Sequence, residues 1–152
     1  MEGAALMGAK ARVLVPVDGS EASVHAAALA GRVAEATDAA VDLLFIGYFD
    51  EETDGDEELD TWLPQSEALA PVKGAASCAL TKAKEAAGAG VSVFCHRRTG
   101  IPAEEIVSYA EEANSALIVM GARGLSAVES FFLGSVSQTV MEKAKVPVLI
   151  VK

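Results

Sequence analysis

The chain contains few residues of the kinds that mark specialised protein classes. Its two cysteines, Cys78 and Cys95, form no C-x-x-C pair and no zinc-ligand spacing, so a disulfide framework and a zinc site are disfavoured. No apolar run is long enough to span a bilayer, and residues 1–11 lack the apolar core of a secretion signal. We therefore expect a cytoplasmic protein without a membrane partner, in which residues 1–11 form a flexible leader.

Basic residues are also scarce, with 12 Lys and Arg against 22 Asp and Glu and a formal net charge of -10. Because nucleic-acid backbones are bound by clustered basic side chains, we expect no nucleic-acid partner. Eight of the 22 acids lie between Asp50 and Asp60, which leaves 14 acids against 12 bases elsewhere. We interpret residues 50–63 as a solvated acidic loop, because the EF-hand-like pattern that starts at Asp50 has Thr61 where a calcium loop needs glutamate.

Aromatic residues make up only 5% of the chain, whereas 51% of it is apolar. This composition favours thin strands covered by closely packed helices, and the length suits a single domain, which we place at residues 12–152. The expected strands are 12–17, 41–47, 91–95, 116–120 and 146–151, and the expected helices are 21–37, 72–87, one that starts at Pro102, and 135–145. This alternation predicts a doubly wound α/β fold with an open, five-stranded parallel sheet.

The strongest functional pattern is a glycine spacing that follows the fourth expected strand. Gly121, Gly124 and Gly134-Ser135 form the spacing Gly-x2-Gly-x9-Gly-Ser. Glycine at a strand exit lets the backbone approach a ligand, and a helix that begins at Gly134-Ser135 offers unpaired N–H groups and a positive dipole end to an anion. The same glycines could serve only turn and helix-start geometry, so the residues alone leave a phosphate site and a plain connection as alternatives.

The spacing resembles the signature of the universal stress protein family, in its ATP-binding branch. Three further segments match that family in the same order, namely Val15–Ser20, Gly100-x-Pro102 and Val146–Val151. The resemblance covers nearly the whole chain. It implies a Rossmann-like fold of the adenine nucleotide alpha-hydrolase type, with strand order 3-2-1-4-5, and a nucleotide-binding protein of the stress response.

The resemblance also implies an ATP site at the ends of three strands and the start of the last helix. The residues that it places there are Pro16, Asp18 and Ile46 around the adenine and ribose, Met120, Gly121 and Gly124 along the ribose and first phosphates, and Gly134, Ser135, Val136 and Ser137 at the outer phosphates. Arg123 either reaches a phosphate or faces solvent. Asp18 either contacts the ligand or caps the following helix, for which Ser20 is equally suited. Mg²⁺ or Mn²⁺ would be carried on the phosphates, without dedicated protein ligands.

Catalytic chemistry has little support in the sequence. His25 and His96 have no partner pattern for a catalytic pair, Cys95 is interpreted as a core residue of its strand, and no base stands out to activate water. We expect at most slow ATP hydrolysis by a regulatory protein that acts on an unknown protein partner. The edge strand Val146–Val151 is expected to pair with its copy in a C2 homodimer, as the resemblance implies. A dimeric interaction module without nucleotide remains the alternative.

Overall fold

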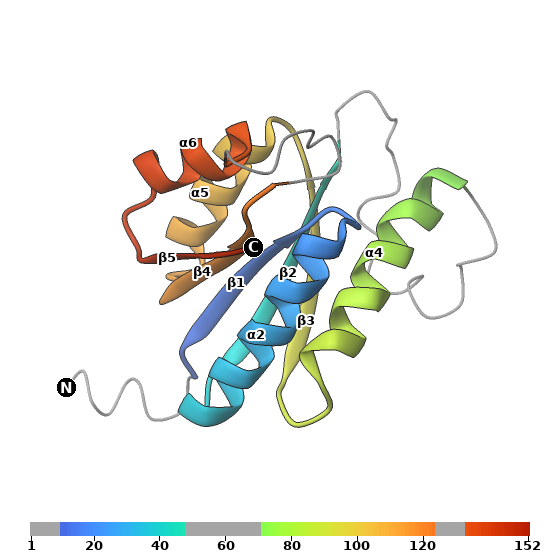
Figure 1. Ribbon diagram of the computed structural model, residues 1–152, viewed down its shortest axis with the longest axis vertical. Helices are drawn as coiled ribbons and strands as arrows, with labels where there is room; N and C mark the ends of the chain where they lie inside the picture. The colour runs from blue at the N-terminus through green and yellow to red at the C-terminus, as the bar shows by residue number, and fades with distance from the viewer. Residues whose placement is uncertain (1–9, 48–70, 124–132) are drawn as a thin grey trace.

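The computed structural model describes residues 10–47, 71–123 and 133–152 (Figure 1). Strands and helices alternate along these residues. The strands are β1 (Arg12–Val17), β2 (Ala40–Gly47), β3 (Val93–Thr99), β4 (Leu117–Gly121) and β5 (Val148–Val151), and the helices are α2 (Glu21–Thr37), α4 (Pro71–Ala87), α5 (Pro102–Glu112) and α6 (Ser135–Lys143). Residues 1–9 of the predicted leader, the acidic loop at 50–63 and Gly124 lie outside the described residues. Of the last two residues of the predicted leader, Ala11 accepts a 2.8 Å bond from the Ala40 N–H.

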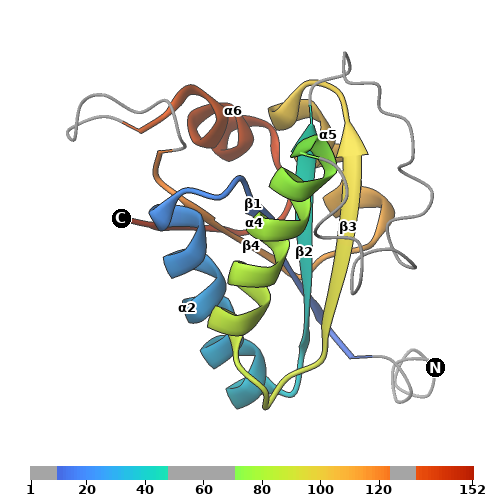
Figure 2. The ribbon, with the colours of Figure 1, turned by 90° about the vertical axis from the view of Figure 1, so that its right-hand side faces the viewer.

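The strands form one parallel sheet with the order β3-β2-β1-β4-β5, which confirms the predicted fold class and strand order. Helices α2 and α4 cover one face, and α5 and α6 cover the other (Figures 1 and 2). The chain leaves β1 toward β2 on one side and returns through β4 on the other side. The carboxyl ends of β1 and β4 are therefore neighbours at the point where the strand order reverses, which is where doubly wound sheets bind ligands.

Small residues let the helices pack closely on the sheet. Four alanines of α2 are completely buried, as are Leu80 of α4 and Val41 and Leu43 of β2. At Gly31 of α2, an added Cβ would lie 2.0 Å from the carbonyl oxygen of Ala87, so α2 and the end of α4 meet backbone to backbone. The low aromatic content predicted this close packing in general terms. The contact at Gly31 is its most extreme instance.

The third strand differs from its predicted bounds of 91–95. It begins at Val93 and continues to Thr99, so His96, Arg97 and Arg98 belong to the strand and pair in register with β2. Three consecutive basic residues suggest a solvated loop, but here each is only partly exposed. The last helix ends at Lys143, and β5 begins at Val148, two residues later than predicted. No helix in the described ranges combines the length and the apolar character needed to cross a membrane.

Candidate functional site

The turn between β1 and α2 forms one side of the carboxyl edge. Ser20 is the N-cap of α2, and its hydroxyl accepts a hydrogen bond of 3.2 Å from the Ser23 N–H. Asp18 Oδ1 accepts a 2.9 Å bond from the Ser20 N–H, and Gly19 between them has a positive φ of 90°. Both residues that the sequence offered as caps are therefore used locally, Ser20 on the helix and Asp18 on the turn that leads into it.

Gly121, the last residue of β4, lies directly against this helix start. A Cβ at Gly121 would stand 2.6 Å from the Ala22 Cβ and 3.0 Å from the Ala22 carbonyl carbon. These distances are too short for any side chain. The structure therefore brings the β1–α2 turn and the end of β4 together, and it supplies a packing reason for Gly121 that does not depend on a ligand.

Helix α6 begins at the same edge and has no side-chain cap from the described residues. Its N-cap is Gly134, and its first intrahelical bond runs from the Gln138 N–H to the Gly134 carbonyl over 3.0 Å. The N–H groups of Ser135, Val136 and Ser137 precede that bond and have no acceptor within the helix. Gly134 has φ -69° and ψ 163°, a conformation open to any residue. Backbone geometry therefore does not require glycine at position 134. The relevant property of Gly134 is instead the space left open by its missing side chain.

The carbonyl of Ala122 connects this helix to β4. It accepts a 2.7 Å bond from the Gly134 N–H and a second 2.7 Å bond from the Ser137 hydroxyl. Ser137 is 2% exposed, and its hydroxyl also lies 3.1 Å from the Gly134 carbonyl. In the structure, the Ser137 hydroxyl thus holds the first turn of α6 on the strand exit, and the phosphate contact that the resemblance implies for this residue stays a prediction. Nothing in the sequence pattern signalled Ala122, because it acts through its backbone alone.

The other predicted residues lie around this edge. Met120 and Ile46 both belong to the core beneath α5 and α6, Met120 buried and Ile46 partly exposed. Pro16 pairs in register with Leu44 of β2 and is partly exposed, as is Arg123 where the chain leaves β4. Among the residues described, no group of three or more His, Cys, Asp or Glu side chains is placed to hold a metal ion.

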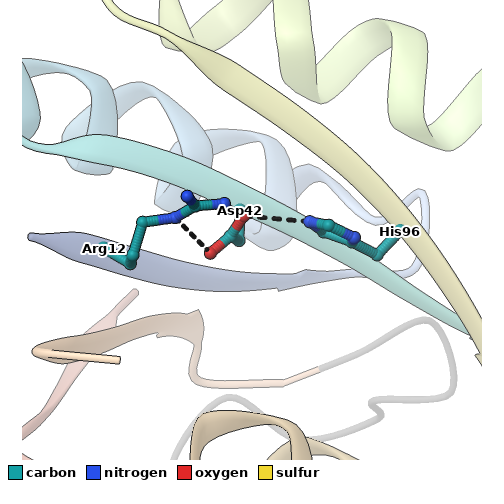
Figure 3. A network of polar contacts seen from close by, with 3 residues as sticks. All are labelled: Arg12, Asp42 and His96. Atoms are coloured by element: carbon teal, nitrogen blue, oxygen red, sulfur yellow. Dashed lines mark hydrogen bonds and ion pairs between the residues drawn. The ribbon is translucent and has the colours of Figure 1, made fainter. Parts of the chain in front are cut away.

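A second polar cluster, which the sequence analysis missed, lies in the sheet under α5. Asp42 of β2 is completely buried and accepts bonds from Arg12 of β1, at 3.0 Å from Nε and 2.6 Å from Nη2 (Figure 3). The Nε2 of His96 on β3 lies 2.9 Å from the same carboxylate. A single acid within the apolar run from Val41 to Leu44 was the available signal. Its two partners are 30 and 54 residues away in the sequence, so the pattern did not predict them.

The electrostatics of this cluster favour a charged carboxylate. Burial opposes ionisation of Asp42, but the hydrogen bonds from His96 and Arg12 outweigh it and hold the pKa of Asp42 below its ordinary value. Tyr109 of α5 packs on His96 with 5.2 Å between ring centroids, and burial together with the charge of Asp42 raises the pKa of Tyr109 to about 12. Asp42 pairs in register with Leu14, four residues and about 13 Å before Asp18 along the sheet, and His96 pairs with Leu44, nearer to the carboxyl edge. The cluster thus joins β1, β2 and β3 to α5 below the candidate site.

The fold and the edge together define a doubly wound α/β protein with an anion-accepting helix start at its switch point. The chain belongs to the universal stress protein family, whose family model matches residues 11–152. It is 34% identical over 146 residues to Universal stress protein MJ0531 of Methanocaldococcus jannaschii, an alignment that covers 93% of this chain and 81% of that protein.

Solved structures agree with this assignment. Universal stress protein UspA from Lactobacillus plantarum superposes with a TM-score of 0.71 at 23% identity, covering 95% of this chain and 99% of that one, which supports the fold. A universal stress protein crystallised in complex with cAMP superposes with a TM-score of 0.64 at 28% identity, covering 94% of this chain and 97% of that one. Some structural neighbours therefore bind adenine nucleotides.

Proposed function

We propose that this protein is an ATP-binding regulatory protein of the stress response, with the phosphates held at the start of α6. The observation that carries the proposal is the first turn of that helix. The N–H groups of Ser135, Val136 and Ser137 have no intrahelical acceptor, and the helix N-terminus adds a positive partial charge. A phosphate is the natural occupant of such a position, and it lies at the switch point of the sheet.

Two further observations support a nucleotide over a smaller anion. The structural neighbour with cAMP is 28% identical along nearly its whole length, and we extend its adenine nucleotide to this chain. The bonds from Gly134 and Ser137 to Ala122 fix the helix start on the strand exit, so the donor groups are ordered before a ligand arrives. In the proposed site, Pro16, Asp18 and Ile46 border the adenine and ribose.

The proposed phosphate contacts come from the backbone N–H groups of Ser135, Val136 and Ser137, at the helix start that Gly134 leaves open. The Ser137 hydroxyl holds that turn on Ala122. Mg²⁺ or Mn²⁺ is proposed to ride on the phosphates. These groups donate hydrogen bonds but include no general base, so we propose at most slow hydrolysis and a role in signalling instead of turnover. The sequence contains only two cysteines, too few for a disulfide framework, which suits the reducing cytoplasm as the proposed compartment.

The proposed assembly is a homodimer through β5. This strand is one edge of the sheet, and Leu149 on it is 38% exposed. Exposed apolar residues on an unpaired strand favour pairing with another strand, and a C2 pair of identical edges closes without leaving a further free edge. The alternative function, a dimeric interaction module without nucleotide, would keep β5 as its interface and leave the α6 start empty.

A substitution at Gly134 tests the nucleotide proposal. Gly134→Val adds a side chain at the anion position, and because φ -69° and ψ 163° suit valine, we expect an unchanged fold by circular dichroism. The expected result is a loss of ATP affinity of at least about tenfold by titration calorimetry, since the side chain blocks the approach of a phosphate. Native mass spectrometry of the freshly purified wild type is expected to show bound nucleotide.

The matched control is Ala144→Val at the other end of the same helix. Ala144 is the C-cap of α6 and has nearly the same backbone angles, φ -69° and ψ 144°. It should retain the wild-type ATP affinity. Equal affinities in Gly134→Val and in the control would contradict the proposed site, and a wild type that binds no adenine nucleotide would favour the interaction module.

A further inference from the structure

Two buried nitrogens of the Arg97 guanidinium, near the carboxyl end of β3, have no acceptor among the described residues. The Nε and Nη1 atoms of Arg97 are buried, and neither has a hydrogen-bond partner in the described part of the structure. Arg97 pairs in register with Phe45 of β2, and its Nη2 lies 3.8 Å from the position that a Cβ on Gly47 would occupy. The guanidinium therefore extends over the last residue of β2, at the carboxyl edge of the sheet.

The two residues next to Arg97 in the sequence have acidic partners on the opposite face of the sheet. His96 contacts the carboxylate of Asp42, and Arg98 pairs with Glu112 and lies 3.6 Å from Glu105. Arg97 alternates with them and faces the side of the sheet that α2 and α4 cover. Among the described residues of β3, it is the one cation without an acidic partner.

Buried guanidinium nitrogens without an acceptor are unfavourable, because their desolvation is not offset by hydrogen bonds. Gly47 presents no side chain beside it, and parallel sheets bind ligands at this edge. A guanidinium carries five N–H donors in a plane, which matches the oxygens of a carboxylate or a phosphate. An anion beside Arg97 would supply both the missing charge and the missing acceptors.

We propose that Arg97 is an anion-binding residue that takes an oxyanion, the phosphate or carboxylate group of a small ligand, beside Gly47. The site is separate from the start of α6. Gly47 ends β2, and β1 lies between β2 and β4, so the position beside Gly47 is about 10 Å across the sheet from the end of β4, to which the start of α6 is bonded. The proposal goes beyond nucleotide binding and does not depend on it.

Arg97→Met provides the first test, because methionine keeps most of the apolar stem and removes the charge. In a chloride buffer without oxyanions, we expect the variant to melt about 3 °C or more above the wild type, since the substitution removes buried nitrogens that have no acceptor among the described residues. Millimolar inorganic phosphate should raise the melting temperature of the wild type and leave that of Arg97→Met unchanged. Arg32→Met, at an exposed position of α2, should behave as the wild type in both buffers.

The second test follows the Arg97 side chain directly. In ¹H–¹⁵N spectra, the Arg97 Nε–H resonance should shift and saturate during titration with inorganic phosphate or with acetate, and the probe that saturates at lower concentration identifies the class of ligand. ATP affinity should be unchanged in Arg97→Met, so failure here is distinguishable from failure at α6.

Three results would overturn the proposal. A lower melting temperature of Arg97→Met in chloride would mean that the chain itself supplies the counter-charge. Equal phosphate responses of Arg97→Met and the wild type would locate binding elsewhere. An Arg97 Nε–H resonance that neither probe shifts would exclude an oxyanion beside Gly47.

Discussion

We expect Gly121→Ala to weaken the fold itself, because the added methyl group would collide with helix α2. Its Cβ would lie 2.6 Å from the Ala22 Cβ, 3.0 Å from the Ala22 carbonyl carbon and 3.2 Å from the Ala22 oxygen. Two of these atoms belong to the backbone and can move only if the helix moves. Overpacking of this kind costs about 1–3 kcal/mol, and the backbone contacts indicate about 2 kcal/mol or more here.

A double variant separates the two parts of this cost. Ala22→Gly removes the 2.6 Å contact but leaves the two backbone contacts, so we expect it to recover about half of the loss when combined with Gly121→Ala. The assay is urea unfolding followed by far-ultraviolet circular dichroism. Gly47→Ala is the matched control, because Gly47 also ends a parallel strand and, among the described residues, the atoms nearest to its added Cβ would be 3.8 Å away.

The same variant distinguishes packing from ligand binding at Gly121. If Gly121→Ala unfolds at the wild-type urea concentration but no longer binds ATP, this reasoning is refuted, and the glycine is required for the nucleotide alone. If stability falls while the folded fraction keeps its ATP affinity, the packing against Ala22 is sufficient to explain the residue.

Two further predictions concern the buried cluster and the sheet edge. Asp42→Asn should lower the free energy of unfolding by about 2–3 kcal/mol near neutral pH in the same assay. This loss is smaller than for a fully buried pair, because the partners of Asp42 are about one-third exposed. The control Asp38→Asn, at an exposed C-cap, should change the free energy of unfolding hardly at all. Because folding lowers the pKa of Asp42, its contribution to stability is present above the pKa of the unfolded state, about 4, and should fade as the pH drops below that value. A stability difference between Asp42→Asn and the wild type that does not change with pH would contradict this prediction. Leu149→Arg on β5 should be a monomer by light scattering. The control Phe94→Arg, on the opposite edge strand β3 where Phe94 is 46% exposed, should remain a dimer. A dimeric Leu149→Arg would exclude the β5 interface.

The strands at the centre of the sheet were predictable because burial on both faces requires continuous apolar runs. Val13–Val17 and Leu43–Ile46 have this pattern, and the structure assigns both runs to strands. The same rule failed at β3, an edge strand, where only one side pairs. There His96 and Arg98 find acids on β2 and α5, so their polarity does not indicate a loop.

The candidate site was predictable only to the level of its glycines. A spacing shows where the chain can approach a ligand, but it does not show what else occupies that space. Ala22 lies 99 positions before Gly121, and no local pattern connects them. In the same way, the burial of Arg97 depends on β2 and β3 pairing with Phe45 beside it, which is a property of the register and not of the composition.

The bond from Gly134 to Ala122 has a consequence for how the protein can vary. It joins two positions that are twelve residues apart in the chain, so the two ends of the intervening segment are held together. A ring closed in this way can be lengthened or shortened without displacing α6, because loop closure depends only weakly on length. The fold therefore does not fix the nine-residue interval of the glycine spacing. Variants with seven, nine and eleven residues between Gly124 and Gly134 would show whether ligand binding requires that interval to be nine residues long.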